Sequence, residues 1–194
     1  MVRYGNPRGF SMLEMLVVMA VTLVVMGVAI PTVASVVRSY RATGDASSIS
    51  SQLLQTRMRA AAGFTRARLR FDLAARTYQL EVFGKATGQF QTEGGVFRLS
   101  GNNSYGFGDI TAPAGTQTAI EQAAACTDAN GDPIPQTACI LFNSRSIPVD
   151  SSGAVTSNAA IYLTDGSGSY FSVTVSPSGR LSSWRYLSPS WETY

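Results

Sequence analysis

Histidine is absent from the 194 residues, and only two cysteines are present. The absence of histidine removes the commonest general base and the commonest zinc ligand. The acidic residues show no buried pairing, and no glycine-rich stretch joins a strand to a helix, so we predict neither an enzyme nor a bound cofactor. The formal net charge is only +3, and Arg3 and Arg8 contribute two of these charges. Charge therefore gives no general argument for nucleic-acid binding.

A long apolar run, from Phe10 to Val37, is the most prominent feature of the chain, and Glu14 is the only charged residue in it. At ~1.5 Å per helical residue this run can cross a bilayer core of ~30 Å. Arg3 and Arg8 precede it, which predicts a cytoplasmic N-terminus and an exported C-terminal part. An unpaired carboxylate in lipid costs at least ~2.5 kcal/mol, so Glu14 needs a partner unless it reaches the membrane interface.

The residues Gly9-Phe10-Ser11-Met12-Leu13-Glu14 resemble the processing signal of type IV pilins and type II secretion pseudopilins. In that family prepilin peptidase cuts after the glycine and methylates the new N-terminal residue, which here implies N-methylphenylalanine at Phe10. A proline commonly follows the glutamate, and Pro31 matches it. The resemblance implies a leader peptide over 1–9, a transmembrane assembly helix over 10–37 and an exported domain over 38–194.

The resemblance also supplies a partner for Glu14. Cleavage would expose an amine on Phe10, and the Glu14 carboxylate of one subunit would neutralise the Phe10 amine of its neighbour. Such a pair forms only at the correct axial offset, so we interpret it as a device that sets register rather than as net stabilisation. Pro31 cannot donate a backbone hydrogen bond and is expected to kink or loosen the helix during assembly.

Two interpretations without a filament remain open. An ordinary secretory signal would be cut after the small residues 32–34, which would leave Ser35 at the N-terminus. A simple membrane anchor would stay uncut from Met1 and hold an exported protein that forms no filament.

Beyond the apolar run the helix is predicted to continue and to end near Gly63. Its apolar positions recur at helical spacing, which indicates a helix packed on a sheet. These positions are Ala42, Ala46, Ile49, Leu53 and Ala60, with Leu54, Met58 and Ala61 alongside.

An alternating strand is predicted over 65–72, with Ala67, Leu69 and Phe71 on a buried face. Arg66, Arg68 and Arg70 share the other face, which we expect to be solvated. This basic row would suit DNA, an acidic neighbouring subunit or lipid headgroups. No aromatic residue is interleaved with it, so a stacking platform for single strands is not expected.

The remaining pattern predicts about seven short strands after the helix, and therefore an α+β pilin-like fold with an antiparallel sheet on the helix. The later strands are expected over 76–83, 96–99, 139–142, 159–163, 170–175 and 180–186. Irregular segments are expected over 84–95, 100–130 (with a weak helical patch at 119–125), 143–157 and 187–194.

Cys126 and Cys139 are expected to form one disulfide that closes a surface loop, worth ~3 kcal/mol in the chain-entropy model, with two free thiols as the alternative. Inside that loop, Asp128 to Asp132 resembles the start of a calcium loop. Pro133 and Cys139 stand where that pattern needs glycine and glutamate, so we predict a polar turn and no metal site.

The order of elements is similar to that of the GspH/FimT family of minor pilins and pseudopilins. FimT-like proteins contact DNA through a Gly-Arg-x-Arg motif, and Gly179 and Arg180 match its first half, whereas Ser182 replaces the second arginine. Arg185 lies nearby but faces the opposite side of a regular strand. The resemblance thus leaves DNA uptake as an alternative function.

The sequence as a whole predicts a structural subunit, a minor pilin or pseudopilin of a type IV pilus or type II secretion system. Its partners would be other pilin subunits, the prepilin peptidase and the assembly platform. Its location would be the bacterial inner membrane, with a single pass and an exported C-terminal domain.

Overall fold

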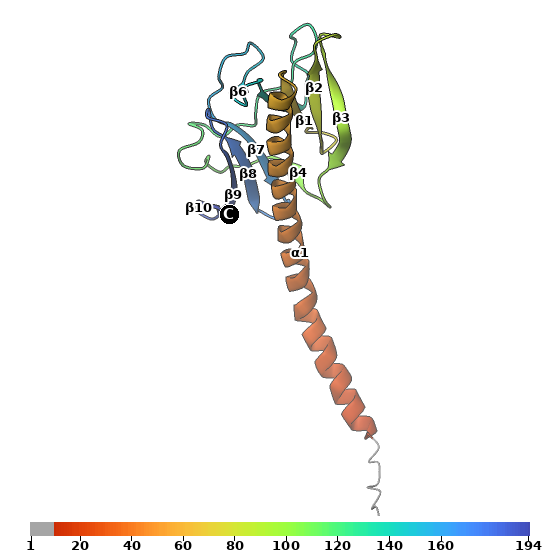
Figure 1. Ribbon diagram of the computed structural model, residues 1–194. Coiled ribbons are helices and arrows are strands. Elements are labelled where there is room, and N and C mark those ends of the chain that lie inside the picture. The colour runs from red at the N-terminus through yellow and green to blue at the C-terminus, as the bar shows by residue number, and fades with distance from the viewer. Residues whose placement is uncertain (1–9) are drawn as a thin grey trace, which may run out of the picture. The chain divides into compact units, whose positions relative to one another are not determined.

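The computed structural model describes residues 10–194, so the expected leader 1–9, with Gly9, lies outside the described residues. One helix, α1 (Met12–Ala62), is followed by antiparallel strands (Figure 1). The strands are β1 (Ala67–Asp72), β2 (Thr77–Gly84), β3 (Gln89–Arg98), β4 (Ser104–Tyr105), β5 (Thr137–Phe142), β6 (Pro148–Val149), β7 (Ala159–Thr164), β8 (Tyr170–Val175), β9 (Leu181–Leu187) and β10 (Ser190–Thr193).

The chain divides into two compact units, one ending at Arg38 and the other comprising Ser39–Tyr194. In the first unit the apolar side chains of α1 are exposed on all sides of the helix. This part of α1 is long and apolar enough to cross a membrane. Because lipid can cover every face of such a helix, the all-round exposure fits a membrane anchor.

In the second unit α1 buries one stripe against the strands. The five predicted core positions, Ala42, Ala46, Ile49, Leu53 and Ala60, are all fully buried, as the helical spacing predicted. Leu54 and Met58 were expected alongside this core, but they are 47% and 63% exposed.

The strands form two five-stranded sheets with the orders β3-β2-β1-β5-β6 and β10-β9-β8-β7-β4. Leu69 and Phe71 of the first sheet and Phe171 and Val173 of the second join the buried stripe of α1 in one hydrophobic core. The expected α+β class, with a long helix packed on antiparallel sheet, is therefore confirmed.

An extended segment, 122–126, links the two sheets. The Ala123 amide donates to Ala160 of β7 at 2.8 Å, and the Cys139 amide of β5 donates to Ala124 at 2.8 Å. The Gln122 side chain bonds both the amide and the carbonyl of Tyr162, at 2.9 and 3.0 Å, as a neighbouring strand would. These bonds replace the weak helix predicted over 119–125, because an extended backbone can satisfy both sheet edges.

The segments expected to be irregular all contain strand residues, namely those of β3, β4, β6 and β10. The strand after β2 was expected to cover only 96–99, whereas β3 already starts at Gln89. Its Gly94-Gly95 pair forms a bulge that shifts the register between Gln79 and Glu81. The expected tail contains β10, whose Trp191 indole donates to the Thr111 carbonyl at 2.7 Å and contacts Tyr162 and Tyr186.

Asp45 of α1 is 6% exposed and binds the chain that follows β3. Its carboxylate accepts the Ser100 amide at 2.8 Å, the Ser100 hydroxyl at 2.8 Å and the Asn103 side-chain amide at 2.6 Å. Burial, with smaller contributions from nearby groups that include Asp45 and Asp72, raises the pKa of the neighbouring Tyr105 phenol, which keeps this tyrosine neutral. Asp45 thus joins the helix to the start of the irregular segment.

Asp45→Ala should lower the free energy of unfolding by about 2–3 kcal/mol, because hydrogen bonds to a charged group are lost and buried donors stay unpaired. Urea unfolding of the full chain in detergent micelles measures this change. Ser47→Ala, at an exposed position of the same helix, is the matched control and should shift stability by under ~0.5 kcal/mol. Equal stability of the two variants would contradict the role given to Asp45.

Candidate functional site

The N-terminal end of the described chain places the motif residues one helical turn apart. Phe10 lies two residues before the start of α1 at Met12 and is 75% exposed, and Glu14 lies in the first turn. The Met15 amide bonds the Ser11 carbonyl at 3.1 Å, so helical geometry already holds at Glu14. Pro31 lies within the bounds of α1.

This arrangement puts a carboxylate near the helix N-terminus, where the partial positive charge of the helix favours it. A cut before Phe10 would create an amine at the same end. Both charges would then lie at one end of an otherwise uncharged apolar segment. Each is costly in lipid when alone, and a bond between them reduces that cost.

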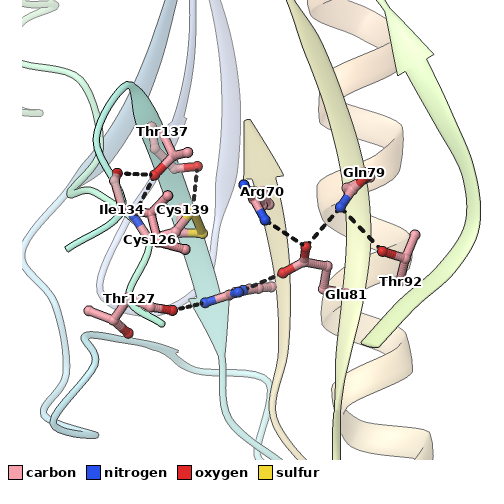
Figure 2. Close-up of polar contacts among 11 residues, drawn as sticks. Arg70, Gln79, Glu81, Thr92, Cys126, Thr127, Ile134, Thr137 and Cys139 are labelled. Carbon is pink, nitrogen blue, oxygen red and sulfur yellow. Dashed lines mark hydrogen bonds and ion pairs between the residues drawn. A yellow bond between two sulfur atoms is a disulfide. The ribbon is translucent and has the colours of Figure 1, made fainter. Parts of the chain in front are cut away.

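The prediction of a solvated basic row is wrong for its central member. Arg68 is 6% exposed, and its Nε lies 2.6 Å from a carboxylate oxygen of Glu81, its direct partner in β2. Its Nη1 donates to the Thr127 carbonyl at 2.9 Å. Figure 2 shows Glu81 at the centre of this network, also facing Gln79 and Arg70, at 2.8 and 3.5 Å. The row is therefore partly neutralised and covered by the loop that follows Cys126.

Aromatic rings also lie beside this row, contrary to prediction. The Arg66 guanidinium carbon is 4.3 Å from the ring centroid of Phe83, and that of Arg68 is 4.0 Å from Phe90. Both rings come from the β2–β3 hairpin, so alternation within the first strand alone did not reveal them. Pairing with the hairpin, and not local sequence, decides what surrounds the arginines.

The expected disulfide is present between Cys126 and Cys139. The Thr137 hydroxyl accepts the Cys126 amide at 3.1 Å and donates to the Ile134 carbonyl at 2.6 Å, as Figure 2 shows. The loop between the cysteines is thereby closed by a covalent bond and by side-chain hydrogen bonds. One of its carbonyls, that of Thr127, binds Arg68, so the loop is part of the network around Glu81.

The acidic residues in this loop form a turn. One carboxylate oxygen of Asp128 accepts the amides of Asn130 and Asp132, at 2.8 and 2.9 Å. These bonds are those of a local side-chain cap on a turn. Within residues 10–194 no group of three or more acidic or cysteine side chains is placed to hold a metal ion.

The two arginines considered for the Gly-Arg-x-Arg motif, Arg180 and Arg185, have different surroundings in the structure. Gly179 adopts a φ of +80° in a turn, and its carbonyl accepts Arg57 Nη1 at 3.0 Å. Arg180 is exposed beside this turn. Arg185 instead donates to the Ser39 hydroxyl of α1 at 3.2 Å and lies over Phe171. The two arginines therefore offer no joint phosphate site, and DNA binding is not favoured.

Sequence reasoning missed Asp45, Arg57 and Glu81. The signal for Glu81 was available, because the register of the β1–β2 hairpin places it directly opposite Arg68. No such signal existed for Asp45 or Arg57, since their partners lie 55 and 122 residues farther along the chain.

Arg68→Met should lower the free energy of unfolding by about 3–5 kcal/mol, because it leaves the Glu81 carboxylate buried without its partner. The double variant Arg68→Met with Glu81→Leu should recover most of this loss. Arg98→Met, at an exposed position, serves as control. Urea unfolding of the full chain in detergent provides the measurement, and a double variant as unstable as the single one would contradict the argument.

Comparison with known proteins agrees with the N-terminal geometry. Residues 5–30 match the family described as the prokaryotic N-terminal methylation motif. No curated protein sequence matches the chain.

Two solved structures of the minor pseudopilin EpsH from the type 2 secretion system of Vibrio cholerae are similar in fold. One shares 15% identity at a TM-score of 0.48 and covers 73% of this chain and 94% of its own. The other shares 16% identity at a TM-score of 0.43 and covers 73% and 91%. The motif match places the N-terminal segment of the chain in the family described as the prokaryotic N-terminal methylation motif.

Proposed function

We propose that this protein is a minor pilin or pseudopilin that is built into a filament through α1. The observation that carries the proposal is the match to the methylation motif over residues 5–30, within which Glu14 is the only acidic residue of an apolar helix. The subfamily that fits the order of elements best is GspH/FimT. The protein then acts as a structural subunit and not as an enzyme.

In this proposal, the subunit is first inserted into the bacterial inner membrane. Prepilin peptidase removes residues 1–9 and methylates Phe10, residues 10–37 anchor the subunit, and residues 38–194 are exported. Other pilin subunits and an assembly platform are the expected partners. The exposed side of α1 within the second unit, which includes Leu54 and Met58, supports packing between subunits along the helix.

The chemistry of assembly follows from the cost of charge in lipid. Before assembly, the Glu14 carboxylate and the new Phe10 amine are both unpaired in the membrane. In a filament, Glu14 of one subunit pairs with the Phe10 amine of the next, and the free-energy cost of each charge in lipid is reduced. A helix shifted along its neighbour would lose the pair, so the pair selects one register.

Intact mass of the protein after coexpression with a prepilin peptidase tests the processing step. We expect loss of residues 1–9 and gain of one methyl group on Phe10. Gly9→Val should remain uncut, because a bulky residue replaces glycine at the cut. A mature chain that starts at Ser35, or one that retains Met1, would overturn the proposed function.

Glu14→Gln tests the pairing step, since it removes the charge while keeping the size of the side chain. Membrane insertion should be unchanged, whereas incorporation into filaments should fall at least tenfold, or ~1.4 kcal/mol. The ratio of protein in sheared filaments to protein in membranes measures this effect.

Thr22→Val is the matched control, because within residues 10–194 the Thr22 hydroxyl bonds only the Val18 carbonyl of its own helix, at 2.7 Å. Its incorporation should equal that of the unchanged chain. Normal incorporation of the Glu14→Gln variant would contradict the pairing.

A further inference from the structure

A groove of about 580 Å³ lies beside the disulfide loop. Its walls come from the β2–β3 hairpin, from residues 127–131 and from residues 151–152, and Arg66, Arg68, Phe83 and Phe90 line it. A smaller hollow of about 130 Å³ also has Arg66, Arg68 and Phe90 in its wall. The larger volume is in the range of clefts that bind small ligands or short peptide segments.

The two arginines of this groove differ in what they still can bind. Arg68 is engaged by Glu81 and by the Thr127 carbonyl. Arg66 takes part in none of the ion pairs or side-chain hydrogen bonds found within residues 10–194. Its guanidinium is instead placed over aromatic rings, 4.3 Å from the centroid of Phe83 and 5.9 Å from that of Phe90.

Stacking positions the Arg66 guanidinium without using its N–H donors. The rings of Phe83 and Phe90 meet edge to face, with centroids 5.4 Å apart, and the Phe83 amide donates to the Arg66 carbonyl at 2.8 Å. These contacts hold the arginine at both its backbone and its side chain. The groove therefore contains a preorganised cationic fork, whose planar geometry suits a carboxylate.

The polar lining of the groove suits a peptide chain around that carboxylate. Hydroxyl and amide side chains in its walls make no hydrogen bond within the described part of the chain. They are Gln89, Thr127, Asn130 and Ser151. Such groups can donate to and accept from the backbone of an extended segment.

The charged residues around the groove indicate whether its ligand carries a single carboxylate or is a polyanion such as DNA. Asp128 lines the groove and Asp150 lines the smaller hollow. A hydrogen bond from the Ser152 hydroxyl, with backbone amides of the same turn, lowers the pKa of Asp150, which stays ionised at neutral pH. Two carboxylates beside one unpaired arginine repel a polyanion. A ligand with one negative group on an otherwise neutral peptide can still pair with that arginine.

We propose that this groove binds an extended peptide segment of a partner protein through one glutamate or aspartate side chain, which Arg66 receives. The inference goes beyond the proposed function and does not depend on filament assembly, since binding is measured on the isolated protein.

The test uses the full chain, labelled with ¹⁵N at arginine, in nonionic detergent micelles. The probe is the peptide acetyl-Gly-Glu-Gly-amide, and acetyl-Gly-Gln-Gly-amide is its neutral counterpart. We expect the glutamate peptide to shift the Arg66 Nε–H resonance to saturation and to bind at least tenfold more tightly than the glutamine peptide. Acetate alone should bind more weakly than the glutamate peptide.

Arg66→Gln should weaken binding of the glutamate peptide at least tenfold. Arg66→Lys, which keeps the charge and the fold but loses the planar fork, should weaken it several-fold. Arg180→Gln changes an exposed arginine outside this groove and should leave binding unchanged.

Equal binding of the two peptides, or unchanged binding by both Arg66 variants, would overturn the proposal. So would acetate that binds as tightly as the peptide, because the ligand would then be a free carboxylate. A short DNA duplex that displaces the glutamate peptide at lower concentration would also overturn it, because the groove would then prefer a polyanion.

Discussion

The structure depends on one helix that satisfies two different environments. As far as Arg38, α1 exposes apolar side chains on all sides, which only lipid or other helices can cover. From Ser39 onward, only a narrow stripe is apolar and fully buried, and alanine occupies three of its positions, Ala42, Ala46 and Ala60. Small side chains let the strands approach the helix closely, and Ile49 and Leu53 fill the wider spaces between them.

Buried polar groups then position the segments that hydrophobic packing leaves undetermined. Asp45 binds the chain after β3, and the pair of Arg68 and Glu81 binds the disulfide loop through Thr127. Such groups add little net stability when they are satisfied, but they are costly when one partner is missing. They therefore favour one arrangement of the loops, and the loop after Cys126 lines the groove beside Arg66 in that arrangement.

Sequence periodicity predicted those features that depend on a single element. The buried stripe of α1 follows from helical spacing, and the face formed by Leu69 and Phe71 and the strand over 170–175 follow from local alternation. Features that depend on pairing between elements were missed. Arg68 has the pattern of a solvated residue and becomes buried only because Glu81 and the loop after Cys126 cover it. The Gly94-Gly95 pair has the composition of a loop but forms a bulge inside β3, because β2 continues on both sides of it. The processing motif was predicted from its resemblance to that of a known family, whereas the relation between Arg180 and Arg185 required the tertiary structure.

The link made by residues 122–126 has a consequence for how the exported part unfolds. Its backbone hydrogen-bonds to β7 of one sheet and to β5 of the other, so opening either strand breaks a bond to the segment that also holds the other sheet. The two sheets are therefore coupled energetically and should melt in one cooperative transition. Length changes in the irregular chain before Gln122 are tolerable, because they leave this coupling intact. An insertion or deletion of one residue between Gln122 and Cys126 would shift the hydrogen-bond register of this segment with one sheet relative to the other.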